Sequence, residues 1–415
     1  MDKTFFAENR KKVVDAMADQ SCLIMFSGSP PVATADEYYP FQPDRNLYYL
    51  TGIKRPDFIL WISKHSGTSE ETLFRPDGKS SVAGQTDFPL SADEAAEISG
   101  VEKVEECGRF NTLFSRHLER MPSDTVYFDF TRLHIEAAPT PLEAYANEFK
   151  AKYPGIEVKD IHKTICEFRV LKSEEEINEI RKAVEITKAG IISMMKVCSP
   201  SANERDLEAE FMYQLYKNGE PQPAFANIVA SGKNALIGHY SANNKPIEDN
   251  VLVQLDVGAQ SNLYCSDVSR AIPSNGKFNE RQTTFYNICF DAMEKLIAYI
   301  KPGVTMAQTI EYGSKFIREA LEELGISDEN TKDLYVYCGF NHFVGLNVHD
   351  VGDRYQPLAP GMVIAIDSAM GIPEEDFNFR IEDDLLITES GNEVLSRAIP
   401  KTVDEIENTF DMNRG

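Results

Sequence analysis

The stretch NVLVQLDVGAQSNLYCSDVSRAI (residues 250–272) decides how the second half of the chain is expected to fold. Apolar and polar residues alternate up to Asp256, the chain turns at Ser261-Asn262, and the pattern returns through Asp267. A turn at that point predicts that Asp256 and Asp267 face each other across a hairpin, with Cβ atoms about 5 Å apart. Because like charges in that position destabilise a hairpin, a cation is expected between them, and a divalent metal ion is the simplest choice. The alternative is two aspartates that face solvent on a mobile hairpin.

Two segments near the C-terminus also carry carboxylates. PGMVIAID ends an apolar strand at Asp367, and NFRIEDDLLIT places Arg380, Glu382 and Asp384 on one face of the next strand. A lone carboxylate in a buried strand is costly unless something pairs with it. We therefore expect Asp367 to share a site with Glu382 and with the two aspartates of the hairpin.

Three of the seven histidines lie in the segments between and before these strands. His342 and His349 belong to the glycine-punctuated stretch YCGFNHFVGLNVHDVG, and His239 belongs to SGKNALIGHYSANN. The other four histidines are predicted to be isolated surface residues of the N-terminal part, at positions 65, 117, 134 and 162.

Three aspartates, one glutamate and one histidine make a ligand set that is mostly oxygen with one imidazole. Such a set suits two divalent ions such as Mn²⁺, Co²⁺ or Zn²⁺, held about 3.5–4 Å apart by bridging carboxylates. A water between the two ions would become a bridging hydroxide near neutral pH and attack a carbonyl that the ions polarise. The residue pattern therefore predicts metal-assisted hydrolysis of an amide bond.

The organisation of the chain points to two domains. A length of 415 residues is long for a single core, and the change of pattern places a boundary near Lys172. Residues 1–172 show short apolar runs between helical segments, as in a small α/β domain. Residues 173–415 show two helices followed by strands, twice over, which predicts an α+β domain of two similar halves that enclose a site. Capping boxes are expected to open three of its helices, at Ser173/Glu176, Ser201/Glu204 and Thr305/Gln308.

Composition limits the classes of function. The chain has 42 Lys+Arg against 66 Asp+Glu, a formal net charge of −24, and such a field repels nucleic acid and anionic membrane surfaces. Its seven cysteines include no CxxC pair, which argues for a reducing compartment. Neither a signal-peptide pattern nor an apolar run of the ~18 residues that cross a bilayer is visible. We therefore expect a cytoplasmic protein without nucleic-acid or membrane partners.

The segments LDVGAQSNLYCSDVSR, HFVGLNVHDVG, PGMVIAID and RIEDD, in this order, resemble the pita-bread metallopeptidases. The likeness is greatest to the aminopeptidase P (Xaa-Pro aminopeptidase) and Xaa-Pro dipeptidase branch, and DRNLYYLTGI resembles the accessory domain of that branch. The resemblance implies an aminopeptidase P-like accessory domain over 1–172 and a pita-bread catalytic domain over 173–415. It implies removal of an N-terminal residue that precedes proline, with peptides carrying proline in the second position as substrates. It also implies two divalent ions, Mn²⁺ foremost, and a homodimer or homotetramer.

The resemblance implies a role for each of five metal ligands. Asp256 would bind one ion, and Asp267 and Glu382 would bridge both ions. His342 would bind the second ion, with Asp367 beside it as a ligand and as the general base for the water.

The resemblance also implies roles for residues around the ions. His239 and His349 match histidines that orient the substrate and stabilise the developing oxyanion. Arg380 matches an arginine that braces the metal-bound carboxylates.

The chain departs from the family pattern at three positions. The family usually has glutamate at the position of Asp367, and because ligand distances hold within about 0.2 Å, the shorter side chain would weaken binding of the second ion or impair turnover. Cys338 stands where the family has a histidine, and it is expected to be a buried thiol, with a thiolate ligand as the alternative. Gly371 stands where the family has a tyrosine, so an aromatic wall near the site would be missing.

Two other functions stay open beside the Xaa-Pro aminopeptidase. An Xaa-Pro dipeptidase (prolidase) would need a cation that holds the free C-terminal carboxylate of a dipeptide, and the sequence does not locate one. A catalytically degenerate paralogue that acts as a binding protein is the second alternative, although such relatives typically lose most of the ligands.

Overall fold

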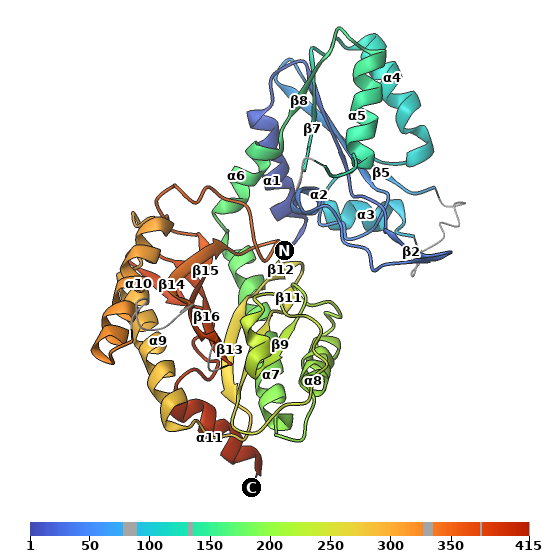
Figure 1. Cartoon of the computed structure of the whole chain (residues 1–415). Coiled ribbons are helices and arrows are strands. Elements are labelled where there is room, and N and C mark those ends of the chain that lie inside the picture. The colour runs from blue at the N-terminus through green and yellow to red at the C-terminus, as the bar shows by residue number, and fades with distance from the viewer. Residues whose placement is uncertain (78–88, 132–135, 327–334, 374–375, 415) are drawn as a thin grey trace. The chain divides into compact units, whose positions relative to one another are not determined.

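The computed structural model describes residues 1–77, 89–131, 136–326, 335–373 and 376–414 (Figure 1). The chain divides into two compact units, Met1–Phe168 and Arg169–Gly415. This division lies close to Lys172, and the assignment of 1–172 and 173–415 as the two domains stays a prediction. In the described part of the chain, no helix has the length and apolar character that crossing a membrane requires.

The N-terminal unit is built on a six-stranded mixed sheet of order β6-β5-β4-β1-β7-β8. β1 pairs antiparallel with β4 and parallel with β7, so it lies in the centre of the sheet. The strands are β1 (Ser21–Phe26), β4 (Ile59–His65), β5 (Thr68–Arg75), β6 (Val104–Glu106), β7 (Thr125–Phe128) and β8 (Glu157–Asp160), beside a small ribbon of β2 (Val32–Thr34) and β3 (Glu37–Tyr38). The helices are α1 (Lys3–Ala16), α2 (Arg45–Thr51), α3 (Ala92–Ser99), η1 (Cys107–Arg109), α4 (Phe110–Arg120), α5 (Pro141–Lys152) and α6 (His162–Val170).

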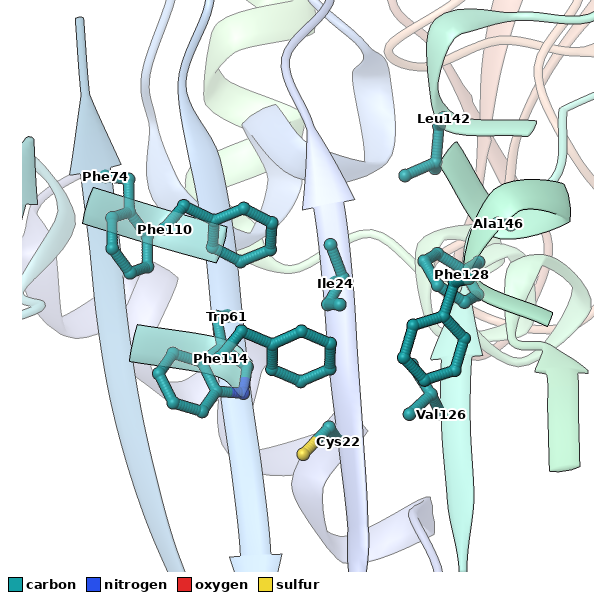
Figure 2. Packing of buried hydrophobic residues seen from close by; sticks show 11 residues of the cluster. Cys22, Ile24, Trp61, Phe74, Phe110, Phe114, Val126, Phe128, Leu142 and Ala146 are labelled. Atoms are coloured by element: carbon teal, nitrogen blue, oxygen red, sulfur yellow. The ribbon is translucent and has the colours of Figure 1, made fainter. Parts of the chain in front are cut away.

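An aromatic core fills the space between this sheet and helix α4. Figure 2 shows Phe110 and Phe114 of α4 packed over Trp61 of β4 and Phe74 of β5. The ring centroids of Trp61 and Phe114 lie 5.6 Å apart in an edge-on arrangement, which is a favourable geometry for aromatic pairs. The single tryptophan of the chain therefore reports on the packing of the N-terminal unit.

The C-terminal unit repeats an order of two helices followed by strands, as predicted. The first half has α7 (Glu174–Val197), α8 (Glu204–Lys217), β9 (Ile228–Ser231), η2 (Gly232–Leu236), β10 (Leu252–Val257), β11 (Gln260–Ser261), β12 (Tyr264–Cys265) and β13 (Val268–Pro273). The second half has α9 (Glu280–Tyr299), α10 (Met306–Glu323), β14 (Tyr335–Phe343), β15 (Val363–Ile372), β16 (Phe377–Ile387), β17 (Asn392–Val394) and the closing helix α11 (Val403–Arg414). One sheet has the order β13-β10-β9 and the other β14-β15-β16-β17. Figure 1 shows α8 beside β9, and α9 and α10 beside β15 and β14. The predicted α+β class is confirmed.

The helices α7 and α10 begin at their predicted capping boxes, but α8 does not. Asn203 caps α8 with Asp206 as its box partner, so the predicted box of Ser201 and Glu204 is wrong. Asn caps a helix as well as Ser does, and the Glu204 carboxylate has other partners. It is fully buried and accepts a hydrogen bond of 2.8 Å from the Tyr240 hydroxyl.

The hairpin of residues 250–272 forms with a register two residues away from the predicted one. Asn262 and Leu263 make the turn, both with positive φ (47° and 69°), as a two-residue hairpin turn requires. Asp256 therefore pairs with Ser269, and Asp267 lies in the break between β12 and β13. Because side chains alternate with a period of two, a shift of two residues leaves Asp256 and Asp267 on the same side of the hairpin.

The second pair of carboxylate-bearing strands follows the predicted pattern. In the antiparallel ladder of β15 and β16, Asp367 lies opposite Glu382, and Ala369 lies opposite Arg380. β14 joins the other edge of β15 with His342 opposite Ala365. These residues share one face of the sheet, since each is separated from its neighbour by two positions.

Candidate metal centre

Three carboxylates from both halves of the C-terminal unit meet in one buried cluster. One oxygen each of Asp256, Asp267 and Glu382 lies within 4.8 Å of the other two. Each of these side chains is buried. The two aspartates that were predicted to face each other are thus brought together by the third carboxylate on β16, although they do not pair across the hairpin.

His342 turns one ring nitrogen toward this cluster. Its Nε2 lies 3.4 Å from Asp267 Oδ2 and 3.6 Å from Glu382 Oε1. Its Nδ1 donates to the carbonyl oxygen of Phe343 at 3.1 Å. Metal-binding histidines commonly have this arrangement, because the hydrogen bond of one nitrogen fixes the other toward the ion.

Asp367 lies at the edge of the cluster. Its Oδ2 accepts a hydrogen bond of 3.1 Å from the Tyr337 hydroxyl, and its Oδ1 is buried without a hydrogen-bond partner among the described residues. Within the same described ranges, its carboxylate does not belong to the close groups of ligand atoms around Asp267. This position agrees with a side chain that is one methylene shorter than glutamate.

Unpaired oxygen atoms show that the cluster suits cations. Among the residues that the structure describes, five buried carboxylate oxygens have no hydrogen-bond partner. One of them, Asp350 Oδ2, forms an ion pair with Lys172 at 3.2 Å, and the other four lie in or beside this cluster: Oδ1 of Asp256, Asp267, Asp367 and Asp384. Leaving a buried acceptor unpaired costs about 1–3 kcal/mol, and more for a charged group. Carboxylate oxygens with one imidazole are the donors that Mn²⁺, Co²⁺ and Zn²⁺ accept. The residues present therefore fit a site for divalent ions.

The pKa values of the cluster also indicate a site that binds cations. Burial, followed by the charge of Glu382, raises the pKa of Asp267 and of Asp367 well above its usual range. The pKa of Glu382 is lowered despite its burial, because His342 and Arg380 outweigh the desolvation. Burial alone would lower the pKa of His342, but its contacts with Asp267 and Glu382 outweigh this effect and raise the pKa to about 11. The carboxylates thus exceed the nearby cationic side chains in number, which favours binding of added cations.

Arg380 lies against two of the carboxylates. It donates through Nη2 to Asp256 Oδ2, and its Nε is 3.5 Å from Glu382 Oε2. Its backbone nitrogen donates to Gln254 Oε1 at 2.6 Å, and Nε donates to the Ser269 hydroxyl at 3.0 Å. These bonds fix the guanidinium beside Asp256, where it balances part of the negative charge.

His349 lies at the exposed side of the cluster, and His239 is close enough to act on it through its charge. The ring centroid of His349 is 4.4 Å from that of His342, and a nitrogen of His349 lies within 4.8 Å of ligand atoms of His342 and Asp267. Burial and the charge of His342 lower the pKa of His349, and His239 contributes in the same direction. His239 and His349 are both exposed, so both are accessible to a substrate.

Sequence reasoning gave no role to several side chains that hold the cluster together. Asp384 is fully buried, and its Oδ2 accepts from the backbone nitrogen of Asp267 at 3.0 Å. The Ser269 hydroxyl donates to Glu382 Oε2 at 2.9 Å. In the sequence, only Asp384 could have been found, because it follows Glu382 by two residues and therefore lies on the same face of the strand. A serine such as Ser269 or a tyrosine such as Tyr337 has no distinctive pattern in a strand.

Two departures from the family pattern have a structural explanation. Cys338 pairs with Ser368 and therefore faces away from Asp367, toward α10, where a Cβ on Gly313 would lie 2.8 Å from its Sγ. Burial raises the pKa of Cys338 to about 12, so it is the buried thiol that was expected and does not face the carboxylates. Gly371 lies opposite the Asn378 side chain, and a Cβ there would be 2.8 Å from Asn378 Oδ1.

A buried carboxylate cluster with one imidazole, contributed by both halves of a duplicated α+β unit, suits divalent ions that activate water for hydrolysis. Residues 178–389 match the model of metallopeptidase family M24, and residues 6–127 match the aminopeptidase P N-terminal domain. The chain belongs to metallopeptidase family M24.

Named relatives resemble the chain over its whole length. The Xaa-Pro aminopeptidase of Haemophilus influenzae is 29% identical over 432 residues, which cover 99% of this chain and 98% of the relative. The structure of a putative aminopeptidase P from Bacillus anthracis has a TM-score of 0.93 at 37% identity and covers 100% of this chain and 99% of that chain. Escherichia coli aminopeptidase P with the inhibitor Pro-Leu has a TM-score of 0.89 at 27% identity, with the same coverage. The predicted fold and the predicted family are confirmed.

Proposed function

We propose that the protein is a metal-dependent Xaa-Pro aminopeptidase, which removes the N-terminal residue of peptides with proline in the second position. The observation that carries this proposal is the buried cluster of Asp256, Asp267 and Glu382 with His342, whose unpaired oxygens fit divalent ions. The preference for proline rests on the relatives, which are Xaa-Pro aminopeptidases along the whole chain. No feature of the cluster favours the degenerate binding protein, since every proposed ligand keeps its donor atoms.

The proposed ligands follow the positions of the side chains. Asp256, Asp267, Glu382, His342 and Asp367 would hold the divalent ions, with Asp267 and Glu382 shared between the ligand sets. Mn²⁺ is the proposed ion, with Co²⁺ or Zn²⁺ as alternatives, because an oxygen-rich set with one imidazole accepts all three; the Escherichia coli relative has been solved in a zinc-substituted form with product. Ions bound there would activate a water and polarise the scissile carbonyl.

The side chains around the cluster orient the reactants. Asp367 is the proposed general base: Tyr337 holds its Oδ2, which leaves Oδ1 to take a proton from the attacking water. His349 has a lowered pKa, so its neutral imidazole is available to hydrogen-bond the peptide, together with His239. Arg380 keeps Asp256 in place by donating to its carboxylate.

Phe340 is the proposed contact for the proline ring. It lies opposite Asp367 on β14, and its side chain stays 46% exposed although it is aromatic. The Tyr337 and Phe340 ring centroids are 5.9 Å apart, so the two rings form one apolar surface beside the proposed base. A saturated five-membered ring would bury this surface, which is favourable by about 25 cal/mol per Å².

Arg354 supplies a cation that the dipeptidase alternative requires. The Arg354 guanidinium lies 5.3 Å from the centroid of Phe340, and its charge contributes to the lowered pKa of His349. A cation in this place would suit the free carboxylate of an Xaa-Pro dipeptide. Its Nη2 also donates to the Asn341 carbonyl oxygen at 3.0 Å, which ties it to β14.

Hydrolysis of peptides of two lengths tests the proposal. The full chain is stripped of metal, reconstituted with Mn²⁺, and assayed with an Xaa-Pro-Yaa tripeptide and an Xaa-Pro dipeptide. We expect release of the first residue from the tripeptide, and loss of this activity by at least about 10²-fold in Asp256→Asn. Asp411→Asn, an exposed aspartate of the same unit, is the matched control and should keep full activity. Cleavage of the dipeptide alone would favour the dipeptidase, and cleavage of neither would refute the peptidase.

The compartment and the assembly are part of the proposal. We propose a cytoplasmic enzyme. All seven cysteines are free thiols, which supports this proposal because thiols persist in a reducing compartment. The proposed homodimer or homotetramer rests on the family resemblance alone.

A further inference from the structure

A second cluster of metal-ligand side chains lies in the N-terminal unit. Cys22 on β1, His65 at the end of β4 and His117 in the last turn of α4 bring a sulfur and two imidazole nitrogens within 4.8 Å of one another. These two histidines were predicted to be isolated surface residues, and that prediction is wrong: both are partly buried and they contact each other. Position 134 lies outside the described residues, and His162 is held by Asp129 at 2.6 Å.

Two of the three distances within the cluster match a tetrahedral zinc ion, and the third, between Cys22 and His65, is at most 4.8 Å. Zn–S bonds of about 2.3 Å and Zn–N bonds of about 2.05 Å at tetrahedral angles separate S from N by about 3.6 Å and N from N by about 3.3 Å. In the structure, Cys22 Sγ lies 3.6 Å from His117 Nε2, and His65 Nε2 lies 3.1 Å from His117 Nε2. Both edges thus lie within a few tenths of an ångström of the tetrahedral values.

The surroundings suit bound metal. Cys22 is fully buried beside the aromatic core that Figure 2 shows, and the Ser123 hydroxyl lies 3.7 Å from its sulfur. The Trp61 ring packs edge-on against His117, with centroids 5.0 Å apart, and fixes the imidazole.

We propose that Cys22, His65 and His117 bind one Zn²⁺ ion, in a site separate from the carboxylate cluster. One thiolate and two imidazoles are softer donors than carboxylates and favour zinc over Mn²⁺. On binding, the Cys22 thiol releases its proton to solvent and the sulfur forms the metal bond, without change of oxidation state. Three protein ligands leave a fourth position for water, and the ion joins β1, β4 and α4 at one edge of the aromatic core.

The alternative needs no ion. One imidazole would donate an N–H to the nitrogen of the other, and the thiol would pack beside them. The two arrangements differ in metal content and in the presence of a metal–thiolate bond, and both differences are measurable.

Cobalt substitution of the full chain tests the proposal. Thiolate bound to Co²⁺ gives a charge-transfer band in the near ultraviolet, and the proposed ligands of the carboxylate cluster include no sulfur, so the band does not come from that cluster. Its loss on replacement of Cys22 assigns it to the Cys22 thiolate. We expect the band in the unaltered chain and its loss in Cys22→Ser and in His65→Gln. We also expect one zinc ion fewer per chain by mass spectrometry after zinc loading of either variant, with peptide hydrolysis within about twofold of the starting rate.

Two controls keep the outcome decisive. Cys107→Ser removes another partly buried thiol of the same unit and should keep the band. His65→Gln alters the side chain at a strand end, and fluorescence of the single tryptophan shows whether either variant keeps the packed core. The absence of a band in the unaltered chain, or its persistence in Cys22→Ser, would overturn the proposal. Because hydrolysis is scored separately, these results do not depend on the proposed peptidase activity.

Discussion

Replacing Tyr337 by phenylalanine removes one hydroxyl that holds the proposed base. That hydroxyl donates to Asp367 Oδ2 at 3.1 Å, and the other oxygen of Asp367 is already unpaired among the described residues. A hydrogen bond to a charged group contributes about 1.5–3 kcal/mol. Loss of a partner that orients a ligand typically weakens metal binding 10–100-fold, or about 1.4–2.7 kcal/mol. The two ranges agree, and we expect Tyr337→Phe to weaken Mn²⁺ binding by about 30-fold.

Calorimetric titration of the metal-free chain with Mn²⁺ measures this effect. The weaker of the two binding steps should be the one affected, with a fall in kcat/KM for an Xaa-Pro-Yaa peptide at subsaturating Mn²⁺. Tyr312→Phe is the matched control, because Tyr312 stacks on Tyr299 with centroids 4.0 Å apart, away from the cluster. Equal Mn²⁺ affinity in Tyr337→Phe and in the control would refute the assignment of Asp367 as a ligand.

Three further predictions concern the length of the Asp367 side chain, a buried ion pair and the pH dependence of stability. Asp367→Glu restores the methylene that the family has, and kcat/KM should rise about tenfold or more if reach limits turnover; an unchanged rate would mean that the pocket has adapted to aspartate. Asp383→Asn leaves the fully buried Arg270 guanidinium without its counter-charge 2.8 Å away, which should cost about 3–5 kcal/mol in urea unfolding followed by circular dichroism; tryptophan fluorescence from the other unit should not shift. Asp129 raises the pKa of His162 to about 10, so this pair stabilises the N-terminal unit fully below about pH 6.5 and loses its effect as the pH rises toward 10. The contribution is on the order of 2 kcal/mol after solvent screening, and His162→Gln should abolish the pH dependence of the tryptophan-detected unfolding midpoint.

The carboxylate cluster was predictable because strand periodicity does not depend on exact pairing. Asp256 and Asp267 had to share a face, and Glu382 had to lie on the face of Arg380, whatever the register. The actual turn at Asn262 and Leu263 moved the pairing by two residues and left the faces unchanged. The helices α7 and α10 were predictable for a similar reason, since a capping box is a local signal.

Contacts between distant segments were not predictable from one sequence. Cys22, His65 and His117 lie on three separate elements, and nothing in the local pattern of any of them signals the others. Tyr337 meets Asp367 only because the bulge between Cys338 and Phe340 sets the register of β14 against β15. Residues of this kind become visible only when the tertiary packing places them together.

The most direct test of the central claim is the metal dependence of Xaa-Pro-Yaa hydrolysis by the full chain, measured against bound Mn²⁺. The metal-free chain should be inactive, and activity should return as the carboxylate cluster fills, with Asp267→Asn losing both bound Mn²⁺ and hydrolysis. Activity that survives complete removal of metal, or a fully loaded chain that cleaves no Xaa-Pro peptide, would contradict the account.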